Sequence, residues 1–123
     1  NEIGNRAVIR LYPIGAQDWI AERKYDCIWL QWTLMYLTDD DAVKILKQCK
    51  ANLKENGKIF VKDNGYPSTE ETLAAWNSED HSFARSHQSY LNLFQKAGVE
   101  ILEDLSQPNW DPELLPLYVF VLN

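Results

Sequence analysis

The clearest pattern of hydrophobic and polar positions lies in the middle of the chain, at residues 25–37 (YDCIWLQWTLMYL). An unbroken apolar run from Cys27 to Leu30 is followed by the polar Gln31 and by Trp32. A strand that is buried on both faces of a sheet has such a continuous run rather than an alternating one. We therefore expect a central strand here, with Gln31 at its carboxyl end, where open α/β sheets bind their ligands.

Two amphipathic helices are predicted. Thr38 precedes three aspartates, which is typical of a helix start because threonine caps helices and acids favour the first turn. Apolar positions then recur at helical spacing, and Asn56-Gly57 is expected to end this helix. Ser86 is expected to cap a second helix at residues 88–97, which Gly98 ends.

Further strands are predicted at residues 7–13 (AVIRLYP), 58–62 (KIFVK), 99–105 and 117–122 (LYVFVL). Asp63-Asn64-Gly65 is expected to break the second of these at its carboxyl end. The last two strands are joined without a helix, and a short connection forces an antiparallel neighbour. The element order therefore predicts an α/β sheet whose last strand runs against the others.

Residues 66–80 have no clear period and contain a proline and several acids. We expect a long insertion over the strand ends, with a short helix around Glu70 to Trp76. Long loops in this position tend to be lids or binding loops.

The composition of the chain argues against several kinds of partner. The chain has 123 residues, 46% of them hydrophobic, with a formal net charge of -6, which suits a single domain with a sizeable core. The acidic balance argues against a nucleic-acid partner and would suit a cationic substrate. No stretch approaches the roughly 18 apolar residues of a membrane span, so no membrane partner is expected. Cys27 and Cys49 fit no metal-ligand spacing; we expect no metal and two cysteines buried in the core.

Several segments, taken in their order and spacing, resemble the α-N-terminal protein methyltransferase family. They are Gly15–Trp19, Ile28–Trp32 continuing into Tyr36–Asp39, Lys62–Asn64, Asp80–Ser82 with Arg85, and Pro112–Leu122. The resemblance implies a Rossmann-like class I methyltransferase fold. It also implies transfer of methyl groups from S-adenosylmethionine to the α-amine of proteins that begin Xaa-Pro-Lys, in the cytoplasm or the nucleus.

The resemblance also implies roles for individual residues. Asp80 and Asn64 match the pair that orients the substrate amine and helps to deprotonate it. Ala16 and Gln17 match cofactor contacts beside the adenine, and Gln31 matches a contact to the methionine end of the cofactor.

Substrate contacts are implied at Trp32, Tyr36, Asp63 and Ser82. Tyr36 stands where the family usually has a histidine, and a tyrosine with a pKa near 10 is a poor base at neutral pH. We expect the strand tips at Gln31-Trp32 and Asp63-Asn64 to share one pocket, covered by the segment that contains Asp80.

Without the resemblance, each residue has a more ordinary interpretation. An aspartate such as Asp80 in an acidic loop is usually solvated, Asn64 in Asp-Asn-Gly is by default a turn former, and Trp29 and Trp32 are by default core aromatics. Only Gln31, a polar residue that ends an apolar strand, is better explained by a ligand than by packing.

One departure from the family concerns the glycine-rich loop. No G-x-G sequence follows a strand anywhere in the chain, so the first two strands of the fold and their cofactor loops are expected to be missing. Residues 1–123 would then form one partial domain with an exposed apolar edge at Cys27–Gln31, completed by a second copy or by an amino-terminal half.

Two alternative functions stay open: a non-catalytic methyltransferase-like binding or scaffold module, and a methyltransferase that acts on small molecules.

Overall fold

A computed structural model of the chain describes residues 10–67, 74–107 and 109–123. In chain order its elements are the short 3-10 helix η1 (Ala16–Asp18), β1 (Tyr25–Gln31), the short 3-10 helix η2 (Leu34–Tyr36), α2 (Asp39–Ala51), β2 (Leu53–Tyr66), β3 (Ala74–Asn77), β4 (Ser82–Ser86), α3 (His87–Ala97), β5 (Ile101–Ser106) and β6 (Leu117–Leu122).

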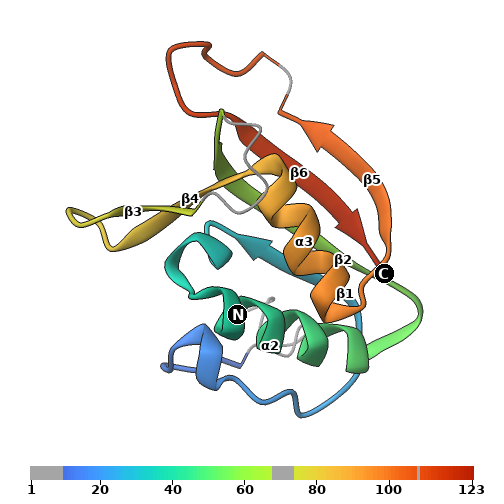
Figure 1. Ribbon diagram of the computed structural model, residues 1–123. Helices are drawn as coiled ribbons and strands as arrows, with labels where there is room; N and C mark the ends of the chain where they lie inside the picture. Colours follow the sequence, from blue (N-terminus) through green and yellow to red (C-terminus); the bar gives the residue numbers. More distant parts are fainter. Residues whose placement is uncertain (1–9, 68–73, 108) are drawn as a thin grey trace, which may run out of the picture.

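The main sheet has the strand order β1-β2-β6-β5. β1 and β2 are parallel, whereas β6 runs antiparallel to both β2 and β5. Helices α2 and α3 lie side by side over one face of this sheet (Figure 1). This arrangement confirms the predicted α/β fold with a reversed last strand.

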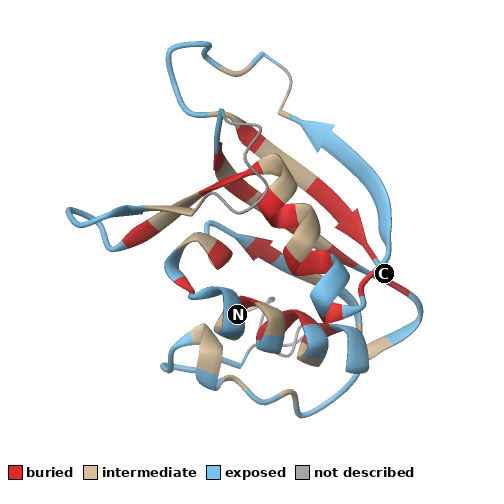
Figure 2. Cartoon of the chain, viewed as in Figure 1, coloured by how far each residue is buried: buried red, intermediate tan, exposed pale blue. Residues whose placement is uncertain are grey.

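The hydrophobic core lies between that sheet face and the two helices (Figure 2). Leu46 of α2, Ile59 of β2, Phe94 of α3 and Phe120 of β6 have no exposed surface. The rings of Phe94 and Phe120 meet edge to face, with their centroids 4.8 Å apart. The sheet and the two helices therefore form two layers with the core between them.

Both helices begin where the sequence predicts. The hydroxyl of Thr38 accepts a hydrogen bond from the N–H of Asp41 (3.2 Å), and that of Ser86 accepts one from Ser89 (3.1 Å). Gly98 ends α3 with a φ of 72°, a left-handed conformation that glycine adopts without steric cost.

Helix α2 ends earlier than predicted, at Ala51 rather than at Asn56-Gly57. Asn52 already forms the cap, and Leu53 pairs with Tyr25 of β1, so the chain enters the sheet at that point. Pairing with β1 satisfies backbone groups here in place of a further helical turn, for example through the hydrogen bond from the N–H of Tyr25 to the carbonyl oxygen of Asn52 (2.7 Å).

The prediction that Asp63-Asn64-Gly65 breaks the second strand is wrong, because β2 continues to Tyr66. Neighbours on both sides extend the ladder: Asn64 pairs with Leu117 of β6, and Gly65 pairs with Arg85 of β4. A Cβ added at Gly65 would lie 1.9 Å from a ring carbon of Tyr118. Glycine is present here to admit a tyrosine ring rather than to make a turn.

β1 is less buried than its apolar sequence predicts. Only Leu30 is buried, while Cys27, expected in the core, is exposed. Trp29 is 54% exposed and stacks on Phe60 with a centroid separation of 5.3 Å. Among the described residues only β2 pairs with β1, so the other edge of β1 has no neighbour there.

Two further predictions are corrected. Residues 10–13 form no strand, in keeping with the lack of a pairing strand beside them in the described part of the chain; residues 7–9 lie outside it. In place of a helix near residue 76, Ala74–Asn77 forms strand β3, which pairs antiparallel with β4, and residues 70–73 lie outside the described residues. The two strands form a hairpin that projects from the body (Figure 1).

Candidate active site

A pocket of about 280 Å³, the strand-end pocket, lies where β2, β4 and η2 meet. It is lined by Met35, Asn64, Asn77, Asp80, Ser82, Phe83, Ala84, Trp110, Leu114 and Leu115. Three residues that the sequence singled out, Asn64, Asp80 and Ser82, therefore share one pocket, although Asn64 comes from β2 and the other two from the β3–β4 hairpin.

Asp80 is held in place by Ser82. Its Oδ1 accepts hydrogen bonds from the hydroxyl of Ser82 (2.6 Å) and from the N–H of the same residue (3.1 Å). Asp80 is exposed, whereas Ser82 is only 5% exposed. The buried serine thus fixes a solvated carboxylate at the mouth of the pocket.

Asn64 is fixed through its backbone. Tyr90 of α3 donates a hydrogen bond from its hydroxyl to the carbonyl oxygen of Asn64 (2.8 Å), and β6 pairs alongside. Side chains along a strand alternate between faces, so the half-buried Asn64 side chain reaches the pocket while that of its neighbour Asp63 points into the core.

Asp63 does not lie where a substrate contact would be. Its side chain has no exposed surface and does not line the pocket. Oδ2 accepts a hydrogen bond from the N–H of Leu34 (3.1 Å), and Oδ1 has no hydrogen-bond partner among the described residues. Burial raises the pKa of Asp63 to about 7, although the Leu34 N–H and the charge of Arg85 oppose the shift.

Gln31, Trp32 and Tyr36 lie at the same end of the sheet but do not line the strand-end pocket. Gln31 is exposed, and its Oε1 accepts a hydrogen bond from Trp29 Nε1 (3.0 Å). Trp32 has a φ of 46° and is 45% exposed, and Tyr36 is 52% exposed. The two strand tips are neighbours, yet the single shared pocket expected from the sequence includes only the Asn64 side.

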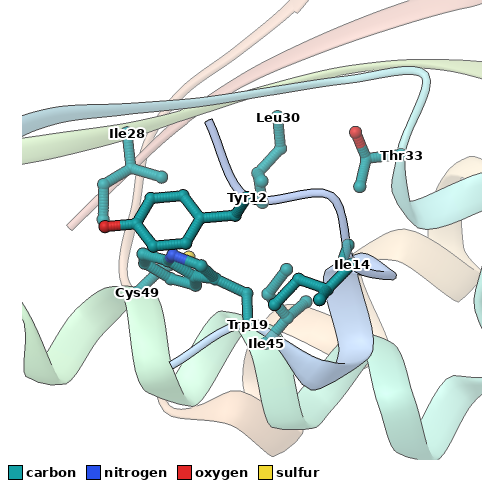
Figure 3. Close-up of a pocket in the computed structure, with 9 residues that line it drawn as sticks. Tyr12, Ile14, Trp19, Ile28, Leu30, Thr33, Ile45 and Cys49 are labelled. Atoms are coloured by element: carbon teal, nitrogen blue, oxygen red, sulfur yellow. The ribbon is translucent and has the colours of Figure 1, made fainter. Parts of the chain in front are cut away.

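A second, apolar pocket of about 310 Å³ lies between β1 and α2 and is closed by the segment from Tyr12 to Trp19 (Figure 3). It is lined by Tyr12, Ile14, Ala16, Trp19, Ile28, Leu30, Thr33, Ile45 and Cys49. Of the predicted cofactor residues, Ala16 lines this pocket, whereas Gln17 is half-buried beside it in η1 and Gln31 lies on the opposite face of β1. An aromatic heterocycle such as adenine suits walls of this kind.

Sequence reasoning missed three large apolar residues of the strand-end pocket, Trp110, Leu114 and Leu115. They lie in the loop before β6, where no hydrophobic period exists. Trp110 Nε1 donates a hydrogen bond to the carbonyl oxygen of Leu115 (2.8 Å), which folds the loop back on itself. The only sequence feature that could have identified these pocket residues is the presence of large apolar side chains in a loop.

Two kinds of feature were not found in the described residues. No group of three or more His, Cys, Asp or Glu side chains there is arranged to hold a metal ion. None of the described helices is long and apolar enough to cross a membrane.

Comparison with known proteins identifies relatives over nearly the whole chain. Residues 1–123 match the family model described as AdoMet dependent proline di-methyltransferase. An alpha N-terminal protein methyltransferase 1 from Dictyostelium discoideum is 39% identical over 90% of this chain and 40% of its own length. An N-terminal Xaa-Pro-Lys N-methyltransferase 1 from Mus musculus is 33% identical over 98% of this chain and 52% of its own length.

Solved structures agree with this match. A SAM-dependent methyltransferase from Leishmania major superposes with a TM-score of 0.79 at 35% identity, over 88% of this chain and 42% of its own. A methyltransferase from Clostridium acetobutylicum, with a TM-score of 0.72 at 13% identity, shows the likeness of fold alone. The chain thus spans about half the length, or less, of the relatives it matches.

Proposed function

Because the chain belongs to the family of AdoMet-dependent proline di-methyltransferases, we propose that it contributes the substrate side of an enzyme that methylates the α-amine of protein N-termini. The observation that carries the proposal is the strand-end pocket, in which Asn64, Asp80 and Ser82 meet. The acceptor we propose is a protein that begins Xaa-Pro-Lys, the class named for the mouse relative.

The pocket has the groups that such an acceptor requires. Methyl transfer needs a neutral amine, and an α-amine has a pKa of about 7.7–8.0, so one well-placed carboxylate is enough to take its proton near neutrality. Asp80, fixed by Ser82, takes that proton directly or through water, and the side-chain carbonyl of Asn64 accepts a hydrogen bond that orients the nitrogen. The apolar wall of Trp110, Leu114 and Leu115 suits a proline ring.

S-adenosylmethionine, when bound, supplies a methyl group on a sulfonium centre. The apolar pocket between β1 and α2 fits the flat adenine ring, and we propose that Ala16 and Gln17 border the adenine there. Gln31, at the carboxyl end of β1, would contact the methionine end. Trp32 and Tyr36, both half-exposed at the same sheet end, would contact the first residues of the peptide.

We further propose that the open side of β1 is covered by another part of the enzyme. The relatives are about twice as long as this chain, and Trp29 and Cys27 lie exposed on β1, of which one edge has no partner among the described residues. A free apolar strand edge is prone to pair with whatever strand is offered. The occupant is an amino-terminal half or a second copy, and cofactor binding depends on it.

The test is a methylation assay with S-adenosylmethionine and a peptide that begins Ser-Pro-Lys, beside the same peptide with an acetylated terminus. We expect methylation of the free amine alone. Methylation that survives acetylation would contradict the α-amine assignment. Calorimetry with the peptide and with the cofactor separates the remaining alternative, since peptide binding without any cofactor binding or turnover would favour a non-catalytic module.

A further inference from the structure

A buried ionic cluster lies directly behind one wall of the strand-end pocket. Arg85 of β4 and Asp63 of β2 have no exposed surface, and both side chains reach the η2 turn. Charged side chains are almost never fully buried unless they are paired and hydrogen-bonded. The backbone groups that Arg85 and Asp63 bind therefore indicate which part of the structure this cluster stabilises.

Arg85 binds both ends of η2. Its Nη1 donates to the carbonyl oxygen of Leu34 (2.7 Å) and its Nη2 to that of Leu37 (2.6 Å). Its Nε donates to Oδ1 of Asp39 (3.0 Å), the first residue of α2, whose carboxylate is 53% exposed. The planar guanidinium thus ties η2 and the start of α2 to β4, a geometry that lysine cannot reproduce.

Asp63 binds the same turn from the other strand. Its Oδ2 accepts the N–H of Leu34, the residue whose carbonyl oxygen Arg85 binds. Leu34 is therefore held through both of its backbone polar groups by ionisable side chains from β2 and β4. Those two strands also carry Asn64 and Ser82, and the residue after Leu34 is Met35, which lines the pocket.

We propose that Asp63 and Arg85 are positioning residues that hold the η2 turn, and with it Met35, against the pocket that contains Asn64 and Asp80. This inference rests on the proposed function, since it assigns the pair to the peptide side of that site. It replaces the direct substrate contact that the sequence implied for Asp63 with an action through Leu34 and Met35.

The ionisation of Asp63 makes this hold depend on pH. The groups that face it are the guanidinium of Arg85 from β4, the Leu34 N–H from η2 and the phenol of Tyr90 from α3; Tyr118 of β6 is its partner across the strand pair. Its pKa of about 7 means that acidification through neutrality neutralises the carboxylate. Because burial beneath η2 raises this pKa, the closed η2 turn favours the protonated carboxyl, and ionisation above pH 7 weakens the hold on η2.

The first experiment measures amide hydrogen exchange by NMR in the full chain carrying Arg85→Lys. We expect the amides of Tyr36 and Leu37, which close the η2 turn on Thr33 and Leu34, to exchange about ten- to hundredfold faster, the loss that follows removal of a hydrogen bond to a charged group. Amides of β6 should be unchanged. Arg10→Lys, at an exposed ion pair with Glu22, is the matched control. Unchanged η2 exchange would overturn the proposal.

The second experiment compares the affinity of wild type and Asp63→Asn for a peptide that begins N,N-dimethylproline-Pro-Lys, whose quaternary nitrogen does not titrate. At one pH unit above the pKa only about a tenth of the carboxyl is protonated, whereas one unit below it nearly all is, so wild-type affinity should fall about tenfold from pH 6 to pH 8. Asp63→Asn keeps an acceptor for Leu34 and should lack this fall. Other groups near the pocket, His81 included, are the same in both proteins. Equal pH profiles would overturn the proposal.

The two experiments distinguish failure of the positioning role from failure of the proposed function. A chain that binds none of the peptides at any pH counts against the peptide-binding function, and the exchange rates of η2 then decide the positioning role alone. If Arg85→Lys does not fold, Asp63→Ala, which removes the acceptor of the Leu34 N–H, should give the same faster exchange of the Tyr36 and Leu37 amides, and unchanged exchange would overturn the proposal.

Discussion

At the scale of single residues, Asp63 and Asn64 show how adjacent side chains on one strand take different tasks. Asn64 faces the strand-end pocket, while Asp63 faces the core and binds the η2 turn. The alternation of a β-strand separates them, because consecutive side chains leave opposite faces. Both residues occur in the sequence Lys-Asp-Asn, and only the geometry of the strand shows which side chain can reach a ligand.

Burial of Asp63 predicts how stability varies with pH. Its pKa is about 7 in the folded chain against an ordinary value of 3.8, so the folded state holds a proton that the unfolded state has lost between these values. The contribution of this group therefore falls as pH rises through that window and levels off above it. We expect wild type to lose about 3 kcal/mol more than Asp63→Asn between pH 5 and pH 8, at about 1.4 kcal/mol per pH unit.

Urea unfolding at the two pH values measures this difference. Asp111→Asn, a change at an exposed carboxylate whose Oδ1 accepts the N–H of Glu113, is the control and should follow wild type. Parallel pH slopes for wild type and Asp63→Asn would contradict the assignment of a raised pKa to Asp63.

Asp80 yields a prediction about turnover. If its carboxylate takes the proton of the substrate amine, Asp80→Asn should lower kcat about a hundredfold, the lower range for general base catalysis, because an α-amine is already partly neutral at pH 8. Cofactor affinity should be nearly unchanged, since Asp80 lies in the strand-end pocket and not in the pocket that Ala16 lines. Kinetics and cofactor calorimetry on the assembled enzyme measure both; a collapse of cofactor binding would show that the role is wrong.

At the scale of elements, the length of β2 determines which segments come together at the strand-end pocket. The strand runs to Tyr66 and pairs with β1, β6 and β4 in turn, and this brings the hairpin of β3 and β4 beside the main sheet. The close packing of Gly65 on Tyr118 is what allows the strand to continue.

Gly65→Ala should therefore destabilise the chain, because the added methyl group would overlap the ring of Tyr118. We expect a loss of about 1–3 kcal/mol, the usual range for overpacking. Gly98→Ala is the contrasting variant: no atom lies within 4 Å of its added Cβ, and only the left-handed φ of 72° opposes it, at about 1–2 kcal/mol.

Thermal unfolding of the two variants gives the total losses, and the aromatic near-UV circular dichroism separates their causes. Gly65→Ala should change the tyrosine signal, since Tyr118 must move, whereas Gly98→Ala should leave it as in wild type. A Gly65→Ala protein with wild-type stability and spectrum would contradict the packing argument.

At the scale of the whole molecule, the unpaired edge of β1 governs association. Trp29 is 54% exposed on that strand, with exposed Cys27 beside it. Free strand edges are sites of pairing and aggregation unless charge or cover blocks them. The chain by itself is therefore expected to associate with a second copy through β1.

Trp29→Lys should reduce this self-association, because a lysine on an edge strand disfavours pairing with a second copy. Sedimentation velocity over a range of concentrations measures it. The matched control is Trp76→Lys, a similarly exposed tryptophan (53%) on the β3–β4 hairpin, which should associate as wild type does. Equal association of both variants would place the interface elsewhere.

The sequence by itself determined the helix starts at Thr38 and Ser86, the reversed direction of the last strand and, through the resemblance, the residues Asn64, Asp80 and Ser82 that meet in one pocket. Caps, hydrophobic periods and short connections are local signals, so they can be read without the fold.

Only the tertiary structure decided how buried β1 is, that β2 continues through Asn64, and that Asp63 lies inside, bound to Leu34. Burial, strand pairing and the pKa of a carboxyl group depend on which distant segments pack against a residue, here β4, β6 and η2. No local pattern along the chain records those neighbours, which is why the positioning pair of Asp63 and Arg85 appears only in three dimensions.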